Sequence, residues 1–183
     1  MGNNDAYADD IMMFLMKVFS ENMNNRDNYH NGVWRAGTGS ANMYINTCPA
    51  TADGRLADTP YSASYSPSLN IKTDGLLSVI QSFTKFNLSD IINGGPLTIE
   101  VHDTVLRNDI GISKTAMLVK EFIHLGGHQL QINAVNHDKL CDAKKHPEKY
   151  PDLIVRVWGW SGYFCELDPK YQDQIILRTE YKL

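Results

Sequence analysis

Segments with a helical pattern alternate along this chain with segments that have a strand pattern, and this order most strongly limits the fold. Apolar residues three or four apart predict helices over residues 6–22, 76–86 and 113–125, and a short polar helix is expected over 138–145. Short β-branched or alternating runs predict strands over residues 43–45, 97–101, 130–134 and 153–157. Asp168 followed by Pro169 is typical of a helix start, so a last helix is expected to continue through Arg178 and Thr179. The alternation predicts an α/β fold.

The composition allows one domain with a substantial apolar core. Of the 183 residues, 43% are hydrophobic, and no linker divides the chain. A long irregular stretch is expected around residues 53–67, where Pro60 and Pro67 follow Asp53-Gly54-Arg55. We expect a single domain over residues 1–183, and the absence of a strand before the first helix indicates part of a larger protein.

Neither the charge nor the hydropathy favours nucleic acid or a membrane as a partner. The formal net charge is -4, and Lys and Arg are scattered rather than gathered in a stripe. The apolar run over residues 11–19 is too short to span a bilayer, and no basic segment precedes it. Cys48, Cys141 and Cys165 form no Cys-x-x-Cys pair and predict reduced thiols. We expect a cytoplasmic protein.

Two spacings that are typical of ligand sites have simpler interpretations here. His124 and His128 are four residues apart, as two metal ligands on a helical face would be, but Gly126-Gly127 between them predict a helix end. We therefore expect no metal site. Gly37-x-Gly39 lacks the lysine of a phosphate-binding loop, so a backbone turn is favoured.

Acidic and basic residues are spread along the chain without an evident catalytic grouping. Asp53-Gly54-Arg55 is typical of a turn. Glu100, His102 and Asp103 are interpreted as structural or exposed residues, because no pattern in the sequence brings them together.

Residues 156–164 form the most unusual segment, between the last expected strand and the last expected helix. The segment reads Arg156, Val157, Trp158, Gly159, Trp160, Ser161, Gly162, Tyr163 and Phe164. On these residues alone, Gly159 is explained by a backbone position with positive φ, surrounded by ordinary core aromatics.

The same segment resembles the Arg-Val-x-Gly-aromatic-small-x-x-Phe signature of the pyruvate formate-lyase-like glycyl radical enzymes. Arg156, Val157, Gly159, Trp160, Ser161 and Phe164 carry the resemblance. Further segments are similar to the family's C-terminal region in the family's order: 2–5, 35–40, 53–55, 66–68, 126–133 and 147–150. The resemblance implies an α/β fold that forms the C-terminal part of a glycyl radical enzyme barrel, with a glycyl radical loop near the C-terminus.

The resemblance implies that Gly159 stores a radical on its α-carbon. Such a radical must be planar so that the unpaired electron spreads over the neighbouring amide nitrogen and carbonyl, and only glycine has no Cβ to crowd that geometry. Trp158, Trp160, Tyr163 and Phe164 are expected to shield the radical. Gly162 is the competing assignment, but alignment of the signature places it at a variable position.

The resemblance also implies partners. An activating enzyme that contains an iron–sulfur cluster and uses S-adenosylmethionine removes the glycine hydrogen, and no cofactor is expected to be bound by this chain. The radical then passes to a cysteine on an upstream loop, and none of Cys48, Cys141 and Cys165 matches that position. The chain is therefore expected to need the remainder of a glycyl radical enzyme barrel and to be inactive alone.

One further polar pattern is relevant to the glycine loop. Gln129, Gln131 and Asn133 alternate, so their side chains are expected to share one face of a strand. Two interpretations remain open: these side chains hold the glycine loop in place, or they are exposed to solvent.

Three functions are compatible with the sequence. The chain is the radical-carrying part of a lyase or acyltransferase, an autonomous cofactor protein that repairs an oxygen-cleaved enzyme, or an inert gene fragment. The tryptophans at 158 and 160 differ from pyruvate formate-lyase and are more similar to the branches acting on isethionate or arylacetates. Anaerobic metabolism is implied by the resemblance alone.

Overall fold

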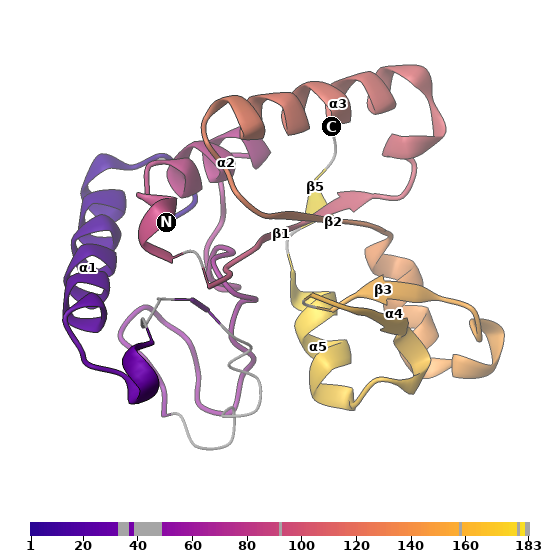
Figure 1. Cartoon of the computed structure of the whole chain (residues 1–183). Coiled ribbons are helices and arrows are strands. Elements are labelled where there is room, and N and C mark those ends of the chain that lie inside the picture. Colours follow the sequence, from indigo (N-terminus) through magenta and orange to yellow (C-terminus); the bar gives the residue numbers. More distant parts are fainter. Residues whose placement is uncertain (33–36, 39–48, 92, 158, 179, 182–183) are drawn as a thin grey trace.

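The computed structural model describes residues 1–32, 37–38, 49–91, 93–157, 159–178 and 180–181. The strand expected over residues 43–45, together with Gly39, Cys48, Trp158 and Thr179, lies outside these ranges. The fold is α/β, as expected, with a three-stranded parallel sheet in the middle and helices around it (Figure 1). Five short 3-10 helices complete the described elements: Tyr29–Asn31, Leu88–Ile91, Val105–Arg107, Pro147–Lys149 and Phe164–Glu166.

Helix α1, Ala6–Asn24, confirms the first predicted helix. The Asp5 carboxylate accepts a hydrogen bond from the Ala8 amide at 2.8 Å and so caps the helix. Asp9 is fully buried and forms an ion pair with Lys85 at 2.7 Å. The helix packs against the rest of the chain mainly through three methionines, and most of its apolar stripe is exposed. The exposed residues are Tyr7, Ile11, Phe14, Leu15, Val18 and Phe19.

The central strand of the sheet is β1, Leu97–His102. It pairs in parallel with β2, Leu130–Val135, from Leu97 opposite Leu130 to His102 opposite Val135, and on its other side with β5, Glu180–Tyr181. We expected β1 to alternate between buried and exposed residues. That expectation is wrong, because both faces of this central strand are covered and only His102 is not fully buried.

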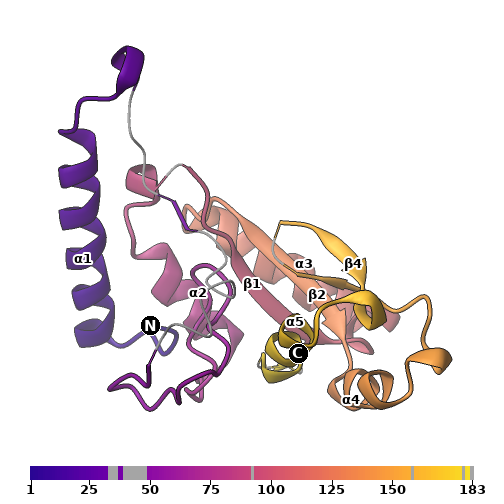
Figure 2. The same cartoon turned by 90° about the horizontal axis from the view of Figure 1, so that it is seen from below.

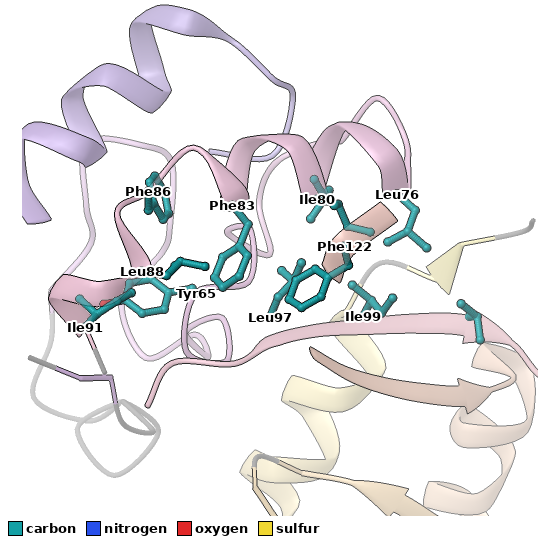
Figure 3. Packing of buried hydrophobic residues seen from close by; sticks show 12 residues of the cluster. Tyr65, Leu76, Ile80, Phe83, Phe86, Leu88, Ile91, Leu97, Ile99 and Phe122 are labelled. Carbon is teal, nitrogen blue, oxygen red and sulfur yellow. The ribbon is translucent and has the colours of Figure 1, made fainter. Parts of the chain in front are cut away.

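One face of the sheet is apolar and is covered by two helices. Helix α2, Leu76–Thr84, and helix α3, Asp109–His124, place Phe83 and Phe122 in a stacked pair at 5.9 Å beside Leu97 and Ile99 (Figure 3). Helix α3 begins four residues before the predicted start, where Asn108 caps the Gly111 amide at 2.8 Å. Met117, Leu118, Phe122 and Leu125 form the apolar side predicted for this helix, and of these Met117 is instead 61% exposed.

The opposite face of the sheet is polar and faces the C-terminal elements. Residues Thr98, Glu100, Gln131 and Asn133 are buried there. Helix α4, which was predicted over residues 138–145, spans His137–Lys145. Helix α5 spans Pro169–Leu177. A second apolar cluster lies among these helices and includes Val155, Val157, Phe164 and Ile175.

The expected buried strand over residues 153–157 is instead short and forms a hairpin. Strand β3, Ile154–Arg156, pairs antiparallel with β4, Ser161–Tyr163, and forms a separate sheet. Ile154 is 59% exposed, so the described residues leave it largely uncovered. The prediction that α5 continues through Arg178 is also wrong, since Arg178 is extended and ends the helix. Helix α1 and the hairpin lie at opposite ends of the molecule (Figures 1 and 2).

Candidate functional site: the turn between β3 and β4

Gly159 lies in the turn that joins the two strands of the hairpin. Its φ is +70°, in the left-handed region that glycine adopts without strain. The Val157 amide donates to the Trp160 carbonyl at 2.9 Å and closes the turn. Gly159 is exposed, and no atom of the described residues beyond its chain neighbours lies within 4 Å of the position a Cβ would take. The α-carbon is therefore accessible, although the positive φ alone would equally fit an ordinary turn glycine.

The backbone before the turn is fixed by side chains of β2. Asn133 Oδ1 accepts from the Arg156 amide at 2.7 Å, and its Nδ2 donates to the Arg156 carbonyl at 2.8 Å. Gln131 Oε1 accepts from the Gly159 amide and from Arg156 Nε, both at 2.9 Å. The interpretation that these strand residues hold the glycine loop is thus confirmed for Gln131 and Asn133. Gln129 instead accepts from the Gly95 amide at 3.3 Å.

A buried ion pair holds the same backbone from the other side. Arg178, directly after α5, donates to Glu100 Oε1 at 2.8 Å, to the Arg156 carbonyl at 3.0 Å and to the Val157 carbonyl at 2.7 Å. The side chains of Arg178 and Glu100 are 6% and 2% exposed. Two consecutive carbonyl groups of the loop therefore have a guanidinium as their donor, and such charge-assisted bonds are stronger than neutral ones.

The remaining residues of the segment divide between the surface and the core. Trp160 is 42% and Tyr163 is 44% exposed, and Ser161 Oγ accepts from Arg156 Nη1 at 3.3 Å. Phe164 is fully buried in the second apolar cluster. Neither Tyr163 nor Phe164 comes within 4 Å of the Gly159 Cβ position. Trp158 lies outside the described residues, so the aromatic shield stays a prediction.

Gly162, the competing assignment, has a different reason to be glycine. It lies in β4, and a Cβ there would come within 2.7 Å of the Trp160 ring. Its lack of a side chain is therefore explained by packing of the indole.

Comparison with known proteins places this loop in a family. The family model described as "Glycine radical" matches residues 61–165, more than half of the chain. The chain belongs to the glycyl radical enzyme family.

Relatives in this family are much longer than this chain. The "Probable dehydratase YbiW" of Escherichia coli (strain K12) is 34% identical over 100% of this chain and 24% of its own length. The trans-4-hydroxy-L-proline dehydratase of Clostridioides difficile is 34% identical over 98% of this chain and 23% of its length. The 4-hydroxyphenylacetate decarboxylase glycyl radical subunit of Clostridioides difficile is 32% identical over 99% of this chain and 20% of its length. The chain thus spans about a quarter or less of these glycyl radical enzymes.

The fold agrees with the sequence comparison. A crystal structure of hydroxyproline dehydratase (HypD) from Clostridioides difficile, with trans-4-hydroxy-L-proline bound, superimposes with a TM-score of 0.93 at 31% identity. The match covers 100% of this chain and 23% of that one. A glycyl radical enzyme from Archaeoglobus fulgidus has a TM-score of 0.90 at 32% identity, over 100% of this chain and 24% of that one. No helix among the described residues of this family member is long and apolar enough to cross a membrane.

The other residues considered as ligands or catalysts are not gathered at the turn that contains Gly159. Cys165 donates to the Tyr150 carbonyl at 3.4 Å, and burial, with smaller effects of Glu148 and Glu166, raises the pKa of its thiol. A raised pKa disfavours the reactive thiolate. Cys141 lies 3.9 Å from His137 on the surface of α4.

The two histidines of the metal-like spacing are separated by the end of α3. Gly126, with φ +83°, ends the helix between His124 and His128. The His128 ring lies 5.8 Å from Phe83, and burial lowers the pKa of this histidine. Among the described residues, no group of three or more His, Cys, Asp or Glu side chains is placed to hold a metal ion.

The acidic and basic residues of the sequence have structural roles. Gly54 has φ +92° in the expected turn, and Arg55 is buried, donates to backbone carbonyls and lies 4.3 Å from the Tyr61 ring centroid. His102 and Asp103 lie at the end of β1, where Asp103 pairs with Arg107.

Sequence reasoning did not find the role of Arg178. In the sequence, Arg178 is a single arginine near the end of the last predicted helix. Its acidic partner, Glu100, lies 78 residues earlier. The only available signal was a charged residue, Glu100, in the middle of an apolar strand, which requires a partner in the interior.

Proposed function

We propose that this chain is the radical-carrying C-terminal part of a glycyl radical enzyme and that Gly159 carries the radical. The observation that carries the proposal is an accessible glycine α-carbon whose flanking peptide groups are held by buried side chains, within a family of glycyl radical enzymes. Removal of one hydrogen atom from that α-carbon leaves the unpaired electron to spread over the adjacent nitrogen and carbonyl. A fixed backbone favours this planar arrangement because little reorganisation is then needed.

The open surroundings of Gly159 support the proposed partners. A radical that must persist needs protection from oxygen, and Gly159 is exposed in the described part of this chain. We propose that the remainder of a glycyl radical enzyme, which carries the cysteine that receives the radical, supplies this cover. The same exposure suits an iron–sulfur activating enzyme that uses S-adenosylmethionine, since it must reach the α-carbon.

The exposed stripe of α1 provides a second surface for the rest of the enzyme. Six large apolar residues there are between 39% and 79% exposed. Soluble proteins seldom leave such a contiguous apolar face in water, so we propose that it packs against the barrel. In this view residues 1–183 form one domain of a larger enzyme and are inactive alone.

A lyase is the proposed reaction class. The relatives described above are named as dehydratases and a decarboxylase, which cleave carbon–oxygen and carbon–carbon bonds. Trp158 and Trp160, on either side of the glycine, favour a lyase over a formate acetyltransferase. The family resemblance further suggests anaerobic metabolism, and the absence of a signal or membrane pattern in the sequence suggests a cytoplasmic setting.

The test is an anoxic electron paramagnetic resonance spectrum after incubation of the chain with a family activating enzyme, S-adenosylmethionine and a reductant. A doublet that disappears in Gly159→Ala is expected. Gly126→Ala is the matched control, because Gly126 also has a positive φ and open space at its Cβ position. A doublet that persists in Gly159→Ala would contradict the assignment.

A second experiment separates an autonomous cofactor protein from a dedicated part of one enzyme. The activated chain is mixed with the Clostridioides difficile trans-4-hydroxy-L-proline dehydratase truncated before the matching region. Restored dehydration would favour the autonomous cofactor protein. A doublet without restored turnover would favour the dedicated part. No doublet with a competent activating enzyme would mean either that the chain needs its missing barrel or that it is an inert fragment.

A further inference from the structure

We propose that Gln131 is the positioning residue of the Gly159 radical: its amide oxygen holds the Gly159 N–H and raises the electron density on the nitrogen over which the radical spreads. This inference rests on the proposed function, and it assigns a role to a residue outside the glycine signature. It is carried by the 2.9 Å hydrogen bond between Gly159 N and Gln131 Oε1.

The orientation of the Gln131 amide follows from its neighbours. Both groups that face its oxygen are donors, the Gly159 amide and Arg156 Nε, so the oxygen rather than the nitrogen must point to the loop. Gln131 is 7% exposed, and its Nε2 has no hydrogen-bond partner among the described residues. A buried N–H group without a partner costs free energy. The two bonds that the Gln131 oxygen accepts must therefore outweigh the cost of leaving Nε2 unbonded.

The electronic effect follows from the direction of the hydrogen bond. In a glycyl radical the amide nitrogen donates its lone pair towards the half-filled orbital on the α-carbon, while the carbonyl withdraws from it. An acceptor on the N–H increases electron density on the nitrogen and strengthens that donation. Arg156 positions the acceptor, because its Nε bonds the same oxygen while its Nη1 reaches Ser161 across the turn at 3.3 Å.

The strand also offers matched variants. Gln131→Met keeps the length of the side chain but removes the acceptor, whereas Gln131→Glu keeps an oxygen acceptor beside Arg156. Gln129→Met is the control, because Gln129 has the same chemistry two residues earlier but bonds the Gly95 amide instead.

The first measurement uses the resting chain labelled with 15N-glycine. The chain has 13 glycines, so Gly159 is identified as the amide signal lost in Gly159→Ala. We expect hydrogen exchange of the Gly159 amide to become about fivefold faster in Gln131→Met, the factor expected for one neutral hydrogen bond. Gln131→Glu and Gln129→Met should retain the wild-type exchange rate, and the other glycine signals report that each variant is folded. An unchanged rate in Gln131→Met would overturn the proposal.

The second measurement is the 15N hyperfine coupling in the paramagnetic resonance spectrum of the activated, labelled chain. We expect the coupling to fall in Gln131→Met and to be preserved in Gln131→Glu and Gln129→Met. A merely structural role would change radical yield without changing this coupling, so an unchanged coupling contradicts the proposal. If the wild-type chain gives no doublet, either alone or with the truncated dehydratase, while its Gly159 amide is protected, the proposed function fails and the electronic role fails with it. A doublet with unchanged coupling overturns only the role of Gln131.

Discussion

Within the β3–β4 hairpin, the residues that anchor the loop and the residues of the turn have opposite surroundings. Val155, Val157 and Phe164 are at most 1% exposed, and side chains from β2 and from the end of α5 bond the backbone of Arg156 and Val157. Gly159 and Trp160, only a few residues away, are exposed. The hairpin thus places an exposed glycine next to a buried support within ten residues of sequence, an arrangement that suits the proposed radical carrier.

The largest difference in stability between the anchoring residues and the turn is expected for substitution of their aromatic residues. Phe164→Ala should lower the free energy of unfolding by about 3–5 kcal/mol, because it removes a fully buried ring and leaves a cavity. Trp160→Ala, at a half-exposed position, should lower it by less than ~1 kcal/mol. Urea unfolding followed by circular dichroism measures both. Equal losses of unfolding free energy in the two variants would contradict the contrast between a buried anchor and an exposed turn.

Removal of the cation that anchors the loop should have the next largest effect. Arg178→Met is expected to lower the free energy of unfolding by about 3 kcal/mol, since the buried Glu100 carboxylate then faces no guanidinium. Arg107→Met breaks an ion pair whose arginine is 67% exposed and should change stability by less than ~1 kcal/mol. Urea midpoints of the two variants provide the comparison, and a loss in Arg178→Met no larger than in Arg107→Met would show that the pair does not anchor the loop.

Substitution of Gly159 should lower the free energy of unfolding only slightly, although it is expected to abolish the radical. Gly159→Ala places an L residue at φ +70° without a close contact in the described chain, so we expect a loss of about 1–2 kcal/mol. Gly126→Ala, at φ +83° and equally open, should lose a similar amount. Thermal unfolding of both variants tests this. A much larger loss at Gly159 alone would mean that its Cβ position is not open.

The smallest expected effect is a pH dependence at the edge of the anchored region. The Tyr150 hydroxyl donates to Asp142 at 2.7 Å, and this bond, with Lys149 and other nearby cations, lowers the pKa of Asp142 below 3.8. The same bond raises the pKa of Tyr150 above 10.0.

The sign of that pH dependence follows from the two shifts. The lowered pKa contributes stability above the ordinary Asp value, which is lost as the pH falls through the folded pKa of Asp142. The raised pKa contributes stability below pH 10.0, which is lost as the pH rises through the folded pKa of Tyr150. Urea midpoints measured across the pH range should show a small decrease at each end in the wild type, and smaller decreases in Tyr150→Phe. Identical pH profiles would argue against the bond.

The helices and the glycine of the loop were predictable because their signals are local. Asp5 and Asp168 cap helices at their predicted starts, and the signature around Gly159 lies within nine residues. The cap at Asn108 was missed, because the apolar spacing of that helix becomes visible only from residue 113. The hairpin was not predictable in detail. Strands of three residues give too short an alternation to distinguish a hairpin from a buried strand.

What the sequence could not provide were the contacts between distant segments. The apolar stripe of α1 predicts a helix but does not say what covers it, and here most of it is exposed. Strand β5 has two residues and is defined only by its pairing with β1. The aromatic shield stays a prediction for a similar reason: Phe164 is near Gly159 in sequence, but its ring packs in the second apolar cluster.

The two hydrogen bonds between Asn133 and Arg156 have a mechanical consequence. An amide side chain that accepts from a backbone N–H and donates to the carbonyl of the same residue imitates the peptide group of an adjacent strand. The Asn133 side chain therefore joins the hairpin to β2 in place of backbone hydrogen bonds, and the backbone ladders of the two sheets remain separate. Separation of the hairpin from the central sheet would therefore break side-chain hydrogen bonds and leave both backbone ladders intact.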